Sequence, residues 1–252
     1  MIGILRVTAL AAGLFSSTFA MADEIKVMSG GAPKELFAHL TPQFEKQTGH
    51  KVKFEYVLIP ALREKIAAGE KTDVLVMPVP ALKDFAKDGK VRADTLSPFG
   101  TVSISVIVKE GTPKPDISTV DKFKEALLVA KSVVHATPGK TPSGIHMGKV
   151  LDQLGLTDAI AKKVTHSPAL EGGAQLVANG KVELGIYPAS EVVEVKGVSI
   201  VGPLPKGIDL TIQYGGAAMP GSSQAAADFV KFMAAPEHRS DWTHAGFVPA
   251  AP

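Results

Sequence analysis

The sequence predicts an α/β protein, and two observations support this fold class. Patterns typical of strands and of helices alternate along most of the chain. The composition is that of a globular protein, with 45% hydrophobic and 21% charged residues among 252. This length suits one large domain or two small ones.

Residues 1–22 have the features of a secretory signal peptide. Arg6 is the only charged residue before Asp23, residues 7–19 are mainly apolar, and Ala20-Met21-Ala22 supplies the small residues that a signal peptidase recognises. A membrane anchor is the alternative, but a spanning helix needs about 20 apolar residues and this stretch is shorter. We therefore expect cleavage after Ala22 and export to the periplasm.

The first part of the mature chain is predicted to contain two strand–loop–helix units. A strand at 25–28 precedes a helix that begins near Pro33, where the fixed backbone angle of proline suits a first turn. The apolar residues of this helix recur at helical spacing until Gly49. The elements that follow are a strand at 51–57, a helix at 61–68 and a strand at 74–77.

The rest of the chain continues the alternation. Residues 101–108 are rich in β-branched side chains and predict a buried strand. The later predicted elements are a helix at 120–131, a strand at 132–136, helices at 145–154 and 170–179, a strand at 182–187, an extended segment at 208–213 and a last helix from 222 or 223 to 234.

Four loops that follow predicted strands could carry chemistry. In the first, Ser29, Gly30 and Gly31 precede a helix, whose free amide groups favour an anion. In the second, Arg63 offers a rigid fork of donors that fits a carboxylate. A tight turn without a ligand and a solvated surface charge are the respective alternatives.

The third loop, 137–144, offers a further set of anion donors in Lys140, Thr141 and Ser143. It is not a phosphate-binding P-loop, because Val134 stands where that motif needs glycine. His146 lies in the helical turn beyond this loop and is either a structural residue or an acid–base group.

The fourth loop, at the end of the strand at 182–187, contributes Tyr187 and Ser190, with Glu191 next to them.

Other kinds of site lack support in the sequence. The chain has no cysteine, which excludes disulfides, thiolate metal sites and cysteine nucleophiles. Its seven histidines show no metal-ligand spacing, and we expect neither a metal nor a cofactor. The net charge of +2 provides no broad basic surface for nucleic acid.

Several segments together resemble a known family. These are the SGGA loop, AAGEKTDVLVMP, TPSGIH before a helix, VANGKVELGIYPASEV and the closing AADFVKFMAAPEHRSDWTHAGFVP. They are similar to the periplasmic solute-binding proteins of ABC transporters, in the molybdate-binding-like branch, over nearly the whole mature chain. The resemblance implies a type II periplasmic binding protein fold, in which two three-layer α/β lobes are joined by a double crossover hinge. It implies that residues 23–103 and 214–252 form lobe I and residues 104–213 form lobe II.

The resemblance also implies that the four loops close on one small anion in the cleft between the lobes. Members that bind molybdate present hydroxyl side chains at three places where this chain has Ala32, 57–60 (Val-Leu-Ile-Pro) and Pro188. We therefore expect an organic carboxylate rather than molybdate as the ligand.

Two functions remain open at this point. The chain is either a receptor that delivers the anion to an inner-membrane permease or an isomerase, because the same branch includes aconitate isomerase. The enzyme would need an acid–base group in the cleft, for which His146 is our candidate, with Glu191 and Tyr187 as alternatives. In both cases we expect a monomer.

Overall fold

The computed structural model describes residues 22–169 and 172–250 of the chain. Residues 1–21 of the expected signal peptide lie outside the described residues. Within the described ranges, no helix has the length and apolar character needed to cross a membrane.

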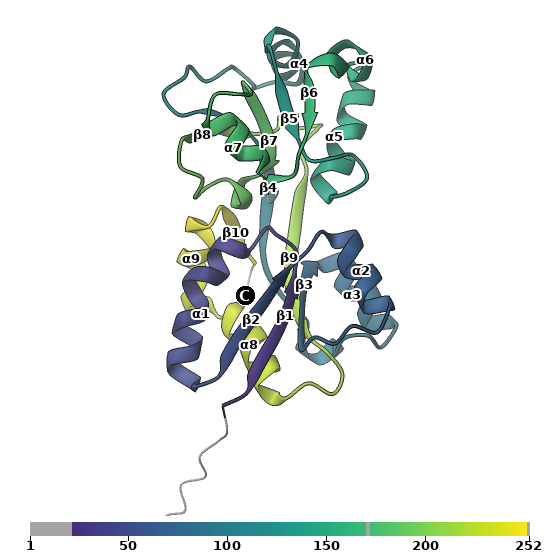
Figure 1. Cartoon of the computed structure of the whole chain (residues 1–252), viewed down its shortest axis with the longest axis vertical. Coiled ribbons are helices and arrows are strands. Elements are labelled where there is room, and N and C mark those ends of the chain that lie inside the picture. Colours follow the sequence, from purple (N-terminus) through teal and green to yellow (C-terminus); the bar gives the residue numbers. More distant parts are fainter. Residues whose placement is uncertain (1–21, 170–171, 251–252) are drawn as a thin grey trace, which may run out of the picture.

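The lower lobe in Figure 1 is built on a mixed sheet. Strand β1 pairs in parallel with β2 on one side and with β3 on the other, and β3 pairs antiparallel with β9. The bounds of these strands are β1 Glu24–Ser29, β2 Lys51–Tyr56, β3 Val74–Pro78 and β9 Thr211–Ala218. The parallel strands β1 and β2 end on the side of the lobe that faces the upper lobe (Figure 1).

Helices cover both faces of this lower sheet (Figure 1). On one face, α1, α8 and α9 enclose an aromatic cluster in which Phe37 contacts both Phe229 and Trp242 with ring centroids 6.3 and 6.4 Å apart. On the other face, α2 and α3 bury Leu62, Leu82 and their neighbours. The bounds are α1 Lys34–Thr48, α2 Ile59–Ala67, α3 Val79–Lys87, α8 Gln224–Met233, α9 Arg239–His244, the short strand β10 Phe247–Pro249 and the 3₁₀ turns η1 Ala93–Thr95 and η5 Pro236–His238.

The upper lobe contains a second group of strands with helices packed around them (Figure 1). Strand β5 pairs in parallel with β6 and β7, and β7 and β8 pair antiparallel with β4. The bounds are β5 Val133–His135, β6 Val164–His166, β7 Leu184–Pro188, β8 Val198–Pro203, α4 Val120–Val129, α5 Pro142–Gln153, α6 Thr157–Ile160 and α7 Gly173–Ala178, with 3₁₀ turns η2 Ala161–Lys163 and η4 Ala189–Glu191.

Strand β4, Ser97–Lys109, belongs to both lobes. Its first half pairs with β9 in the lower lobe, and from Ile104 onward its partners are β7 and β8 in the upper lobe. Strands β4 and β9 pass side by side between the lobes (Figure 1). The α/β fold class and the two-lobed architecture expected from the sequence are confirmed.

Several elements differ from the sequence prediction. Helix α3 was not predicted, because Pro78 and Pro80 in its first turn look like strand-breaking loop residues. The short elements β6, α9 and β10 have at most six residues, too few for a periodic pattern. Helix α5 begins at Pro142 rather than at 145. Helix α7 begins at Gly173, after Gly172 in a left-handed conformation, and residues 170–171 of the predicted helix lie outside the described ranges.

Candidate functional site

Three of the four loops expected to carry chemistry contribute to one cavity between the lobes, and residues 57–59 line it in place of the loop at 60–63. We call it the central cavity, and it holds about 30 Å³ of space for the centres of water-sized molecules. Its lining residues come from both lobes and from β9: Gly30, Gly31, Val57, Leu58, Ile59, Ala136, Thr141, Pro142, Ser143, Pro168, Pro188, Glu191, Ile212 and Tyr214. The carboxyl ends of strands in open α/β sheets commonly form such sites.

The loop before α1 brings backbone close to the cavity. A side chain at Gly30 would meet Ile59 Cδ1 at 2.8 Å and Tyr214 Cε1 at 3.5 Å, so only glycine fits without a shift. Among the described residues, the amides of Gly31 and Ala32 have no hydrogen-bond partner, which leaves them available to an anion at this helix start. The hydroxyl of Ser29 is buried and donates to the Gly30 carbonyl at 2.8 Å, so it is held within the loop.

The start of α5 supplies the facing donors. Thr141 caps the helix, because its hydroxyl accepts a hydrogen bond from the Gly144 amide at 2.9 Å. Ser143 Oγ lies 3.1 Å from Thr141 Oγ1, and both residues line the cavity. Gly144 permits this arrangement, since a Cβ there would overlap the Thr137 carbonyl group. Thr141 and Ser143 thus line the same cavity as the first loop, and their role in binding an anion stays a prediction.

Two titratable side chains from the cavity wall complete the polar set. Burial raises the pKa of the Glu191 carboxyl to about 7. Tyr214 is 3% exposed, and burial together with the nearby Glu191 charge raises the pKa of its hydroxyl, so it remains protonated and can donate. Among described residues, Glu191 forms neither an ion pair nor a side-chain hydrogen bond. The site thus combines neutral donors with one carboxyl group that titrates near neutrality.

Most of the remaining cavity wall is apolar. Val57 and Leu58 from the β2–α2 loop, Ile59 at the start of α2, Pro188 and Ile212 all line the space. None of the described residues that line the central cavity carries a positive charge. The cavity is therefore suited to a small ligand with polar atoms at one end and carbon at the other.

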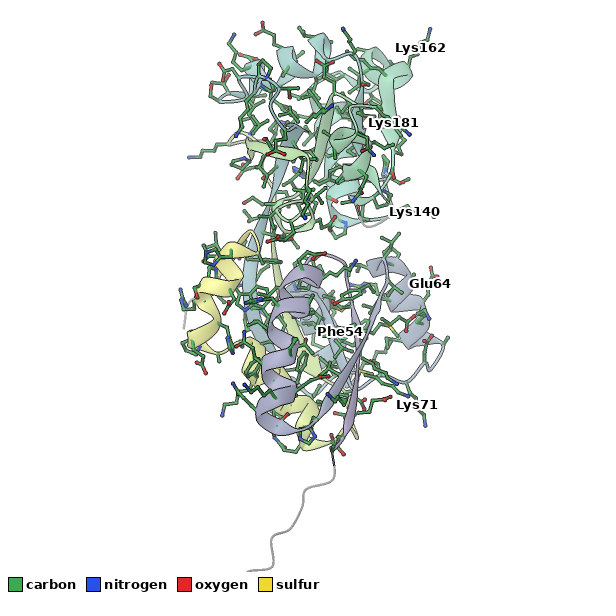
Figure 2. The ribbon with its side chains drawn as sticks, turned by 60° about the vertical axis from the view of Figure 1, so that its left-hand side comes forward. Phe54, Glu64, Lys71, Lys140, Lys162 and Lys181 are labelled. Carbon is green, nitrogen blue, oxygen red and sulfur yellow. The ribbon has the colours of Figure 1, made fainter. Side chains whose placement is uncertain are left out.

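The structure places two expected anion ligands elsewhere. The Arg63 guanidinium lies over the Phe85 ring, with its Cζ 5.5 Å from the centroid, and it does not line the central cavity. Lys140 is exposed, and Figure 2 shows it on the edge of the upper lobe that faces the lower lobe. Neither cation contacts the donors at the two helix starts, so their role in binding the anion stays a prediction.

The two candidates from the fourth loop also have other surroundings. Tyr187 is fully buried and donates a hydrogen bond to the Ser167 carbonyl at 2.7 Å. Ser190 is 1% exposed and lines an adjoining pocket with Lys34 and Gln175. This side pocket shares Gly31 and Glu191 with the central cavity.

His146 lies in a groove beside the central cavity. Its Nε2 atom is 2.8 Å from the Ile208 carbonyl oxygen, which can only accept, so Nε2 carries a proton in this contact. The groove, which we call the hinge groove, opens between α3, α5 and β9 and is lined by Pro78, Val79, Pro80, Lys83, Pro142, Ile145, His146, Lys149, Leu210, Thr211, Ile212 and Gln213. The expected catalytic histidine is thus not among the residues that line the central cavity.

Sequence reasoning missed Tyr214 as part of the site, whereas the apolar segment at 57–60 was expected there from the family resemblance. Tyr214 lies in the middle of β9, and no local pattern distinguishes a strand tyrosine in a core from one at a cavity. Within the described residues, no cluster of three histidine or acidic side chains is arranged to hold a metal ion.

Comparisons with known proteins agree with this geometry. Residues 25–248 match the family model described as bacterial extracellular solute-binding protein. The chain is 31% identical to an aconitate isomerase of Pseudomonas sp., with 97% of each chain covered, and 24% identical to the molybdate-binding protein ModA of Escherichia coli K12, with 91% of each covered.

A solved structure extends the similarity to the fold. The periplasmic molybdate-binding protein of Azotobacter vinelandii superposes with a TM-score of 0.71 at 19% identity, over 90% of this chain and 99% of that one. The type II periplasmic binding protein fold expected from the sequence is therefore confirmed, with neighbours that are anion-binding proteins. The chain belongs to the bacterial extracellular solute-binding protein family.

Proposed function

We propose that the protein is a periplasmic receptor that captures a small organic carboxylate in the central cavity and delivers it to an ABC permease of the inner membrane. The main observation in support is that the cavity is lined by hydrogen-bond donors in one part and by apolar side chains in another. The Gly31 and Ala32 amides and the Ser143 and Tyr214 hydroxyls can surround a carboxylate, and Val57, Leu58 and Ile59 can contact its carbon atoms.

The same division argues against molybdate as the ligand. A tetrahedral oxyanion exposes oxygen in every direction and needs donors on all sides, since each oxygen left against an apolar wall loses its hydration without compensation. Pro188, Ile59 and Ile212 supply no donor side chain to the cavity. An organic acid can place carbon atoms against these residues, so that none of its oxygen atoms loses hydration there without compensation.

A thermal-shift panel tests this function. Mono-, di- and tricarboxylates should raise the melting temperature with increasing concentration, because a ligand stabilises the folded state by RT ln(1 + [L]/Kd). Ser143→Ala should weaken the response about tenfold in concentration, since a hydrogen bond to a charged group contributes about 1.5 kcal/mol or more. Ser240→Ala, at an exposed position on α9, serves as the control. A response to molybdate without a response to any carboxylate would contradict the proposal.

A second candidate function is isomerisation of a tricarboxylate by a 1,3-proton shift, and Glu191 favours it. A carboxyl group with a pKa near 7 that lines the cavity without a paired charge is suited to general acid–base work. The Glu191 carboxylate would take a proton from the allylic carbon as the electron pair moves to shift the double bond. It would then return the proton to the far end of the allyl system, so the reaction needs no oxidant or co-reactant. The 31% identical relative is itself an aconitate isomerase.

Proton NMR in D2O separates the two functions. If the protein is an isomerase, incubation with cis- or trans-aconitate gives the other isomer, and deuterium appears at its allylic carbon to the extent that the proton held by Glu191 exchanges with solvent before it is returned. Glu191→Gln should then abolish turnover and still bind the substrate. Absence of product with retained binding would assign the protein as a receptor. Equal turnover by Glu191→Gln and the parent would remove Glu191 as the proton carrier.

A further inference from the structure

The hinge groove is a larger space that adjoins the central cavity. It offers about 770 Å³ to water-sized molecules, against about 30 Å³ in the central cavity. Pro142 and Ile212 line both spaces, so the two lie next to each other at the start of α5 and at β9. A ligand longer than a few atoms therefore has room in this direction.

The walls of the hinge groove are apolar, with cations at the edges. Its floor and sides include Val79, Ile145 and Leu210, and Ile145 is 44% exposed although it is a large hydrophobic residue. A ligand that covered Ile145 would remove this apolar surface from water, which is favourable at about 25 cal/mol per Å².

Two lysines and one histidine line the groove. Lys83 comes from α3 in the lower lobe, and Lys149 and His146 come from α5 in the upper lobe. No acidic residue is among those that line it, and within the described ranges neither lysine forms an ion pair. The Nε2 contact of His146 with the Ile208 carbonyl fixes the orientation of its ring at the groove. This charge pattern is complementary to an anion that reaches both lobes.

From this arrangement we propose that the hinge groove binds the carbon body and the second acid group of an elongated di- or tricarboxylate, whose first carboxylate is held in the central cavity. The inference rests on the proposed carboxylate function and adds its substrate class. Lys83 and Lys149 act as specificity-determining residues, because they contribute a favourable charge only to ligands long enough to reach them. The ligand also connects the two lobes at a point outside the central cavity.

Isothermal titration calorimetry with acids of increasing length tests the inference. Acetate, succinate and adipate serve as probes, and the variant is Lys83→Gln combined with Lys149→Gln. Lys87→Gln is the matched control, because Lys87 lies on the same helix but pairs with Asp84 at 3.4 Å and does not line the groove. Thermal unfolding of each variant without ligand verifies that the fold is retained.

We expect the parent to bind adipate more tightly than acetate. The double variant should bind adipate about five- to tenfold more weakly than the parent, which corresponds to about 1.0–1.4 kcal/mol and lies within the range of a typical net hydrogen bond. Its affinity for acetate should stay within twofold, and Lys87→Gln should behave as the parent with every acid.

Two outcomes overturn the inference, and they are distinguishable. If the acids bind the parent but the double variant binds adipate with the parent's affinity, the groove plays no part and the proposed function stands. If no acid binds the parent, the proposed carboxylate function falls and the inference falls with it.

Discussion

The raised pKa of Glu191 follows from the position that the preceding strand gives it. Every residue of β7 is buried, and the chain turns through η4 directly into the cavity wall. Glu191 is half-buried, this burial raises the pKa of its carboxyl to about 7, and among described residues no cation is paired with it. The sequence placed Glu191 in a candidate loop, but it could not show that burial shifts its titration to neutral pH.

Replacement of Glu191 by Gln should change the pH dependence of ligand binding. The parent should bind a carboxylate more weakly as pH rises through about 7, because the ionised Glu191 then repels the ligand. Glu191→Gln should bind with an affinity that is constant between pH 6 and 8.5. Calorimetric titration at several pH values measures this, with Glu194→Gln, at an exposed position, as the control. A parallel fall in affinity for Glu191→Gln and the parent would contradict the assignment.

The stability of the apo protein should respond to the same substitution with a definite sign. The pKa of Glu191 is higher in the folded chain, about 7, than the ordinary 4.5, so the unfolded state releases its proton first. Stability is consequently lost as pH rises from about 4.5 to 7. Glu191→Gln should leave the melting temperature unchanged at pH 4.5 and raise it at pH 8, by roughly 2–4 °C for each kcal/mol recovered.

His135, at the end of β5, contributes a pH dependence of stability with the opposite sign. Its side chain is fully buried, its Nε2 has no hydrogen-bond partner among the residues that the structure describes, and burial lowers its pKa to about 4. Because the unfolded chain takes up a proton near pH 6.5 and the folded chain does not, stability is lost as pH falls from about 6.5 toward 4.

Urea unfolding measures this contribution of His135. The free energy of unfolding of the parent should fall more steeply than that of His135→Gln between pH 6.5 and 4, by up to about 1.4 kcal/mol per pH unit. His244→Gln, at an exposed position on α9, should keep the parent's slope, whereas the charge of His166 itself helps to lower the pKa of His135. Identical slopes for His135→Gln and the parent would show that His135 is protonated in the folded state.

At the scale of elements, α5 determines the upper half of the site. Thr141 at its N-cap, Pro142 in its first turn and the glycine at 144 let the helix begin close to the 137–140 loop. These residue types made the loop and the helix predictable from the sequence. The direction of Arg63 on α2 was not predictable, because its contact with Phe85 depends on the packing of α2 against α3.

Substitutions at two glycines of α5, Gly144 and Gly148, test how closely the start of this helix approaches the preceding loop. In Gly144→Ala the new Cβ overlaps the Thr137 carbonyl, so the loop must move, and we expect a loss of about 1–3 kcal/mol in unfolding free energy together with weaker ligand binding. In Gly148→Ala the Cβ lies 3.7 Å from Pro138 Cβ, an ordinary contact, and helix propensity favours alanine by about 1 kcal/mol. Chemical denaturation measures both variants. Equal stability of the two would contradict the close approach at 144.

At the scale of the whole molecule, the two-lobed α/β fold was predictable and the path of the chain between the lobes was less so. Alternating patterns identified most of the longer strands and helices, and the family resemblance supplied the two lobes. The predicted strand at 101–108 is the central part of β4, but pairing with β9 extends β4 back to Ser97. That extension arises from contacts with residues more than 100 positions away, which a local pattern does not contain.

The sharing of β4 has a consequence for how the molecule melts. The thirteen residues of β4 form backbone hydrogen bonds with strands of both lobes. If the sheet of one lobe unfolds, β4 therefore also loses order that the sheet of the other lobe requires. Scanning calorimetry should give one transition with equal calorimetric and van't Hoff enthalpies, and two resolved transitions would contradict this coupling. For the same reason, neither lobe is expected to fold when it is expressed alone as one continuous fragment. A fragment that ends at residue 103 lacks β9 and α8. A fragment that begins at residue 104 lacks the part of β4 that pairs with β9.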